Sequence, residues 1–169
     1  LYSKSKPFTL SSKNLIKTKT RLKIGLLSDT HGYLDPLVFK YFDEVDEIWH
    51  AGDIGSLELL KEIENFKPTK SVFGNIDGHE IRAASPENLI LNIQGVKVLI
   101  THIAGKPPFY NSRVKALIKA NKPNILICGH SHILKVEYDK SNQLLFMNPG
   151  AAGKHGFHKI KTLLRFEIN

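Results

Sequence analysis

The chain has 169 residues with 41% hydrophobic and 24% charged content, which fits one globular domain and excludes two full domains. Of its formal net charge of +8, six positive charges fall in residues 1–21, where no acidic residue occurs. The remainder is close to neutral and has no basic stripe beside aromatic residues, which argues against a nucleic-acid partner. No apolar run approaches the roughly 18 residues of a membrane-spanning helix, and the single cysteine suits a reducing compartment, so we expect a cytoplasmic protein without a membrane partner.

The first 21 residues are rich in Ser, Thr and Lys and contain few apolar residues. Such a segment cannot bury enough surface to offset the entropy of ordering, which predicts a disordered basic extension rather than a binding element. It has no apolar stretch of the kind found in secretory signals, and its similarity to an organellar transit sequence is weak. The folded domain is therefore expected at residues 22–169.

From Leu22 onward, short β-branched or leucine-rich runs alternate with segments of helical period, which is typical of layered α/β structure. The predicted strands are residues 22–28, 46–51, 70–73, 89–94, 97–101, 124–128, 133–138, 144–147 and 162–168. The predicted helices are residues 36–44, 56–66 and 112–121. The candidate helix caps are Asp35, Ser56 and Asn111. A polar turn between the strands at 133–138 and 144–147 predicts an antiparallel hairpin, so the sheet content is expected to be mixed.

Five of the predicted strands end in a short polar motif. The motifs are Ser28-Asp29-Thr30-His31, Gly52-Asp53, Gly74-Asn75, Thr101-His102 and Gly129-His130-Ser131-His132. One such ending alone is more often turn chemistry or a structural histidine than a ligand. Five together, each at the carboxyl end of a strand, indicate a single cleft with metal-binding side chains. The glycines in these motifs remove side-chain bulk where the backbone must pass close to the site.

Two of the motifs carry ligand-type residues that are two positions apart, Asp29 with His31 and His130 with His132. In an extended chain such residues project to the same side, about 6.5 to 7 Å apart. The two ions of dinuclear hydrolases lie roughly 3.5 to 4 Å apart. Each pair can therefore serve two neighbouring ions.

Taken together, these motifs resemble the signature of the calcineurin-like metallophosphoesterases. The strings SDTHG, HAGD, GNID, GHSH and NPGA are most similar to the small bacterial and archaeal phosphodiesterase branch of that family. The resemblance covers about residues 22–169. It implies an α/β fold, a four-layer α/β/β/α sandwich of two mixed β-sheets flanked by helices.

By position, the resemblance also implies a site for two divalent metal ions. Its ligands would be Asp29, His31 and His132 for one ion, Asn75, His102 and His130 for the other, and Asp53 as the bridge. Oxygen and imidazole donors without thiolate suit Mn, Fe, Zn, Co or Ni. The resemblance favours Mn among these metals.

The activity that this site implies is hydrolysis of small phosphodiesters, because two close cations make a hydroxide from water and neutralise charge on a phosphoryl group. Asp53, Asn75 and His102 would contribute to catalysis through the metal ions and through substrate positioning. Asp77, two residues after Asn75, is a candidate for orienting a neighbouring ligand. The sequence leaves open the physiological substrate and the oligomeric state.

The chain departs from the family pattern at one position that matters for proton transfer. Many members place a histidine directly after the Gly-Asn pair, where this chain has Ile76, which cannot donate a proton. His79 is a possible substitute acid, although an exposed loop histidine is the favoured interpretation. In the loop NPGAAGKHGFHK, Lys154 and His155 are candidates for binding the substrate phosphate, with a flexible connection as an equally weighted alternative.

A non-catalytic alternative comes from the same resemblance. The superfamily includes the retromer subunit, which has a similar fold and works as a protein-binding scaffold. A scaffold is under no chemical demand to keep all seven metal donors. Their presence in this chain favours the enzyme.

Overall fold

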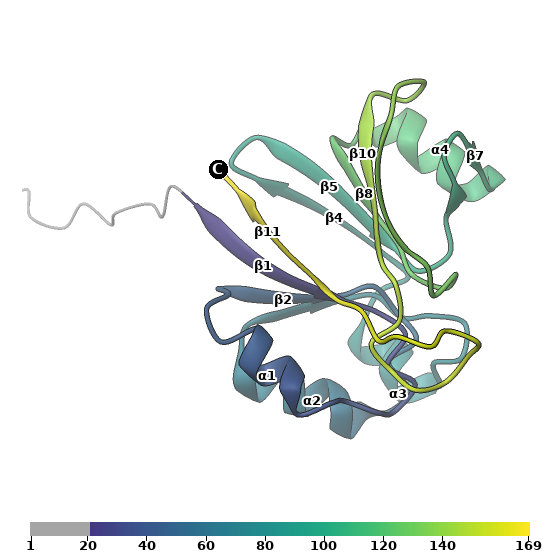
Figure 1. Cartoon of the computed structure of the whole chain (residues 1–169). Coiled ribbons are helices and arrows are strands. Elements are labelled where there is room, and N and C mark those ends of the chain that lie inside the picture. Colours follow the sequence, from purple (N-terminus) through teal and green to yellow (C-terminus); the bar gives the residue numbers. More distant parts are fainter. Residues whose placement is uncertain (1–20) are drawn as a thin grey trace, which may run out of the picture.

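A computed structural model describes residues 21–169 of the chain (Figure 1). The predicted basic extension, residues 1–21, lies outside the described residues except for Arg21. No helix within residues 21–169 is both long enough and apolar enough to cross a membrane.

Two mixed β-sheets form the middle of the molecule. The four-stranded sheet consists, in spatial order, of β11 (Leu164–Ile168), β1 (Leu22–Leu27), β2 (Glu47–His50) and β3 (Thr69–Ser71). The five-stranded sheet consists of β4 (Asn88–Ile93), β5 (Val96–Thr101), β8 (Ile125–Ile127), β10 (Leu144–Pro149) and β9 (Leu134–Asp139). The strands β1, β2 and β3 run parallel, with β11 antiparallel at one edge, and β5, β8 and β10 run parallel, with β4 and β9 antiparallel at the two edges. A separate two-stranded ribbon pairs β6 (Gly105–Lys106) with β7 (Phe109–Tyr110).

Helices cover the outer faces of the two sheets. They are α1 (Leu37–Tyr41), α2 (Leu57–Phe66), α3 (His79–Ala84) and α4 (Ser112–Asn121). Figure 1 shows α1 and α2 on the outer side of the sheet that contains β1 and β2, and α4 on the outer side of the other sheet. The expected four-layer α/β/β/α sandwich is confirmed by this arrangement.

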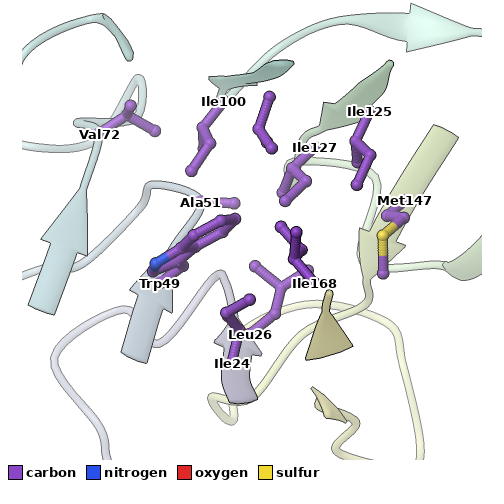
Figure 2. Close-up of a cluster of buried hydrophobic side chains, with 11 residues drawn as sticks. Ile24, Leu26, Trp49, Ala51, Val72, Ile100, Ile125, Ile127, Met147 and Ile168 are labelled. Atoms are coloured by element: carbon purple, nitrogen blue, oxygen red, sulfur yellow. The ribbon is translucent and has the colours of Figure 1, made fainter. Parts of the chain in front are cut away.

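The main core lies between the two sheets, as Figure 2 shows. Every second residue of a strand faces the opposite sheet, so β-branched and leucine side chains from both sheets meet there. The four-stranded sheet contributes Ile24, Leu26 and Trp49, and the five-stranded sheet contributes Ile100, Ile127 and Met147. Each helix layer has its own smaller core beneath it.

All nine predicted strands occur, with ends within two residues of the prediction. Helix 112–121 is confirmed, and helix 56–66 is confirmed from residue 57. The prediction was wrong for residues 42–44, because α1 ends where Phe42 leaves the helical conformation and buries its ring against the backbone of Gly25. The short elements α3, β6 and β7 were not predicted.

The predicted caps accept backbone N–H groups at the helix starts, where these donors have no partner within the helix. Ser56 Oγ accepts from the third residue of α2 at 3.2 Å, and Asn111 Oδ1 accepts from Val114 N–H at 2.9 Å. Asp35 Oδ1 accepts from Leu37 N–H at 3.0 Å. Ser56 and Asn111 are the N-caps of α2 and α4. The prediction for Asp35 was wrong by one residue, because α1 begins at Leu37 and its N-cap is Pro36.

Candidate metal centre

The loops that follow β1, β2, β3, β5 and β8 carry all seven candidate ligands. Within each sheet these strands run parallel, so their carboxyl ends meet at the same edge. Two groups of side chains there bring their ligand atoms within 4.8 Å of one another, as metal ligands require. The groups are Asp29 with His31 and His132, and Asp53 with His102 and His130.

Distances within and between the groups are those of a shared site. In the first group, His132 Nε2 lies 3.4 Å from His31 Nε2 and 3.2 Å from Asp29 Oδ1. In the second group, His102 Nε2 lies 3.2 Å from Asp53 Oδ2. The same Asp53 oxygen lies 3.7 Å from His31 Nε2, so one carboxylate reaches both groups. Asn75 lines the cleft beside them.

The ring of His102 tests whether these residues fit a metal ion. Its Nδ1 lies 2.8 Å from the carbonyl oxygen of Ala51, which only accepts, so Nδ1 carries the proton. Nε2 is then the ring nitrogen that remains for a ligand, and it is buried, without a hydrogen-bond partner, and faces the Asp53 carboxylate. A buried imidazole nitrogen and a carboxylate oxygen 3.2 Å apart are stabilised by a cation between them, either a proton or a metal ion. The donor set therefore fits a divalent metal.

Backbone N–H groups orient the two carboxylates. His130 N–H lies 3.2 and 3.0 Å from the two oxygens of Asp29, and Ile76 N–H donates to Asp53 Oδ1 at 3.1 Å. Because Oδ1 of Asp53 is engaged in this way, Oδ2 is the oxygen that faces the histidines. The loops thus position the carboxylates for ligation before any ion arrives.

Asp77 ties two of the ligand loops together. Its buried carboxylate accepts the N–H groups of Ile54 and Gly55, after β2, at 3.1 and 2.8 Å, and that of Gly74, after β3, at 2.7 Å. The expected supporting position agrees with these contacts. Its part in ligand orientation remains a prediction.

Charge interactions in the centre shift the titration of the buried groups. Burial raises the pKa of Asp29 above its usual value, because water no longer stabilises the charged carboxylate. Burial acts in the same direction on Asp53, but the hydrogen bond and charge of His102 outweigh it and hold the pKa of Asp53 below normal. The two carboxylates in turn outweigh the effect of burial on His102 and raise its pKa. The centre thus brings two buried carboxylates against one imidazole, an arrangement that a bound cation would stabilise.

The ligand loops do not have the extended conformation that the sequence predicted for the i, i+2 pairs. Asp29, His31, Asp53, His130 and His132 have φ angles of 56°, 49°, 55°, 68° and 57°. Residues other than glycine seldom adopt this left-handed conformation, and each instance costs roughly 1 to 3 kcal/mol. The prediction of extended geometry was wrong because the loops after β1 and β2 turn sharply and hydrogen-bond to each other, with His31 N–H donating to Asp53 O at 3.0 Å.

The prediction for the motif glycines is confirmed. A Cβ at Gly74 would lie 2.0 Å from Asp53 Oδ1, and one at Gly129 would lie 2.7 Å from Asp29 Oδ2. A Cβ at Gly52 would lie 2.6 Å from His102 Nδ1. No side chain fits at these positions without displacing a candidate ligand.

Two arginines and one histidine that were not predicted as site residues form hydrogen bonds to the ligand loops. Arg82 donates to the carbonyl oxygens of Asp77 and Gly74, and Arg113 donates to Thr101 Oγ1 and Ile103 O on either side of His102. His50 accepts Gly52 N–H at Nδ1 and therefore donates from Nε2 to Thr30 Oγ1 at 2.9 Å. Burial lowers the pKa of His50 to about 4, so its ring is neutral at pH 7.

A cleft of about 590 Å³ opens over the centre. Its walls include Ile76 and four residues of the loop before β11, namely His155, Gly156, Phe157 and His158. The ring of His155 lies 4.8 Å from that of His31, and the ring of His158 lies 5.2 Å from that of His132. Of these loop residues the sequence had indicated His155 alone, although the repeat of histidines in HGFH was a signal for His158.

Two other predicted site residues lie outside the cleft. Lys154 is not among the residues that line it, and its Nζ lies 3.8 Å from the centre of the Tyr33 ring. His79 is the exposed first residue of α3 rather than a loop residue, and it does not line the cleft either. Neither side chain lines the cleft, and for His79 this agrees with the favoured interpretation of an exposed histidine, whereas the substrate-binding part of Lys154 stays a prediction.

Comparisons with known proteins concern the family and the fold of this chain. The calcineurin-like phosphoesterase superfamily domain matches residues 22–169. A phosphodiesterase of Methanocaldococcus jannaschii is 29% identical over 145 residues, which cover 76% of this chain and 83% of the relative. A solved archaeal phosphodiesterase superposes with a TM-score of 0.65 at 27% identity, over 87% of this chain and 99% of that one.

Vps29 from Entamoeba histolytica, solved with zinc, has a TM-score of 0.67 over 88% of this chain and 87% of its own, at 19% identity, which shows a common fold. The domain match covers the whole described fold apart from Arg21, including all seven candidate ligands. The chain belongs to the calcineurin-like phosphoesterase superfamily.

Proposed function

We propose that this chain is a dinuclear-metal phosphodiesterase that hydrolyses small phosphodiesters. The observation that carries the proposal is the buried pair of His102 Nε2 and Asp53 Oδ2, which face each other at 3.2 Å while Nδ1 of the same ring is engaged by Ala51 O. The first ligand group lies directly beside this pair, and Asp53 is within reach of both groups. One bridged two-ion site accounts for all of these contacts.

In this proposal the ligands divide between the ions as the family resemblance implies. Asp29, His31 and His132 hold one ion, Asn75, His102 and His130 hold the other, and Asp53 bridges them. Carboxylate, amide and imidazole donors without a thiolate suit Mn, which we propose as the metal, ahead of Fe, Zn, Ni or Co. Metal analysis of the purified protein tests this choice directly.

When bound, the two ions would supply a strong nucleophile from water and neutralise charge on the phosphoryl group. The chain supplies the positions of the ligands and a cleft of about 590 Å³, a volume suited to a small substrate. Ile76 lies in the cleft where many relatives have a proton donor, so we expect substrates whose leaving groups depart without protonation. His155, exposed beside His31, can donate an N–H to a phosphoryl oxygen.

The proposed activity is tested with bis(p-nitrophenyl) phosphate after metal removal and addition of single divalent metals. We expect turnover with Mn and loss of turnover in Asp53→Asn and His130→Ala. Asp43→Asn makes the same chemical change at an exposed position outside the centre, and it should retain turnover. Equal turnover by Asp53→Asn and Asp43→Asn would remove the bridging carboxylate from the proposal.

A protein-binding scaffold of the same fold is the second candidate. Binding of a metal does not separate the two candidates, because a zinc complex is known for Vps29. Turnover does separate them, since a scaffold needs the fold but not the chemistry. Full occupancy by two metal ions, with no hydrolysis of any diester in a broad panel, would favour the scaffold.

A further inference from the structure

Strand β9 forms an exposed edge of the five-stranded sheet. One side pairs with β10, and no strand within residues 21–169 pairs with the other side. Leu134, Val136 and Tyr138 alternate along β9 and are 46%, 52% and 57% exposed. A six-residue edge strand with an exposed apolar row is a template for pairing with another chain, which proteins ordinarily block.

The apolar row continues the interior of the sandwich. Cross-strand partners share one face of a sheet, and Val136 and Tyr138 are paired with Met147 and Leu145 of β10. Met147 belongs to the core between the sheets, and Leu145 packs against it. The row on β9 therefore lies on the inner face of its sheet, at a place that the four-stranded sheet leaves exposed.

The sequence of β9 is complementary to itself in the antiparallel direction. About a two-fold axis through Val136, Leu134 comes opposite Tyr138 of the partner subunit, and Val136 comes opposite the same residue of the partner. Lys135 comes opposite Glu137 of the partner subunit, and the axis repeats this contact. Apolar side chains thus meet apolar ones on one face, and opposite charges meet on the other.

We propose that β9 pairs antiparallel with β9 of a second copy of this chain, in register about Val136. The two five-stranded sheets then become one continuous sheet, and the free backbone groups of both edges form a ladder. The two apolar rows join into one strip on the inner face.

The charges on β9 indicate that the chain which pairs with this edge is a second copy of the protein. Lys135 and Glu137 form an ion pair at 2.5 Å within one strand. In the dimer, Lys135 would instead pair with Glu137 of the partner subunit, and Glu137 with Lys135 of the partner subunit. An edge protected against pairing carries charges of one sign, which repel a second copy. Here one positive and one negative residue stand at mirror positions, so two copies attract at both contacts.

The test is the oligomeric state of the full chain, measured by sedimentation velocity over a range of concentrations. We expect a dimer for the unmodified protein. Lys135→Glu and Glu137→Lys each place like charges opposite each other twice and should raise the dissociation constant at least about tenfold. The double variant, Lys135→Glu with Glu137→Lys, restores both pairs and should return the dissociation constant to about that of the unmodified protein.

Three results would overturn the proposal. The first is a monomer at every concentration, because no contact between copies then exists. The second is a dimer that neither single substitution weakens, because its contact then lies outside β9. The third is loss of the dimer when residues 1–20 are removed, because the contact between copies would then depend on this segment and not on β9 alone. Far-UV circular dichroism of each variant shows that the fold is retained, and neither charged residue lines the metal cleft.

Discussion

Substitution of Gly74 by alanine adds a single carbon at the tightest contact of the proposed metal centre. The new Cβ would lie 2.0 Å from Asp53 Oδ1 and 2.3 Å from Asp53 N, whereas real Cβ contacts essentially never fall below 3.0 Å. The φ angle of Gly74 is not in the left-handed region, so the conflict is one of space and not of backbone strain. The loop or the bridging carboxylate must therefore move by about 1 Å.

A shift of that size is large for a metal ligand. Metal–ligand distances are held within about 0.2 Å, so a displaced Asp53 no longer bridges two ions. Changes behind the ligands typically weaken metal binding by about 10 to 100-fold, and displacement of the bridge itself should reach at least about 100-fold, or roughly 2.7 kcal/mol. Overpacking should lower the stability of the fold by about 1 to 3 kcal/mol, which a domain with ordinary stability tolerates.

Gly78→Ala provides the matched control, because it lies four residues further on and its Cβ would meet nothing within 4 Å. We would titrate both variants with Mn by calorimetry, measure their turnover of an aryl phosphodiester, and record their thermal unfolding. Gly74→Ala should remain folded with weak metal binding and little turnover, and Gly78→Ala should match the unmodified protein. Equal metal affinity in the two variants would refute the close approach of Gly74 to the bridging carboxylate.

Three further outcomes follow from individual side chains. Burial lowers the pKa of His50 to about 4 from 6.5, so the unfolded chain binds an extra proton between these values. Unfolding of the metal-free protein in urea should therefore show up to about 3 kcal/mol of stability lost through His50 as the pH falls from 6.5 to 4. His50→Gln should reduce this loss, and the remainder is expected from His31 and His132, whose pKa values burial also lowers. His155→Ala should raise the KM for the diester several-fold, whereas Lys154→Ala should leave KM unchanged, because only His155 lines the cleft. Burial raises the pKa of Cys128 to about 12, so a thiol reagent at pH 8 should label the unfolded protein and leave the native one unmodified, and rapid labelling of the native protein would contradict the buried position.

The candidate ligands could be predicted from the sequence because their signal is local. Each follows a short apolar strand, and the carboxyl ends of parallel strands must share an edge whatever the details of the loops. His130, for example, follows the strand Ile125–Ile127 and a glycine. Both the strand and the glycine can be recognised from the sequence without knowledge of tertiary contacts. The fold class could be predicted for the same reason, because the alternation of strands and helices along the chain is visible in the sequence.

The loop geometry could not be predicted, because it depends on contacts between loops that are far apart in the sequence. The left-handed φ of His31 accompanies a hydrogen bond from its N–H to Asp53 O, a contact across 22 residues that no local pattern records. The helix at His79–Ala84 is short, and its first residue follows a glycine without a side-chain cap, so it lacks the usual start signal. Which of two adjacent loop residues enters the cleft, Lys154 or His155, likewise depends on where Tyr33 lies.

The burial of three polar ligand side chains affects the stability of the centre with and without metal. Asp29, Asp53 and His102 are each almost fully buried, and a centre of this kind without a bound metal ion has two buried carboxylates and one imidazole to balance them. Left-handed backbone at five ligand positions adds further strain. A protein that needs only the surface of this fold would be more stable with apolar side chains at these strand ends. Bound metal ions would offset both penalties at once, so the energetics of the centre favour a metal-bound state, and turnover is the property that separates a hydrolase from a scaffold.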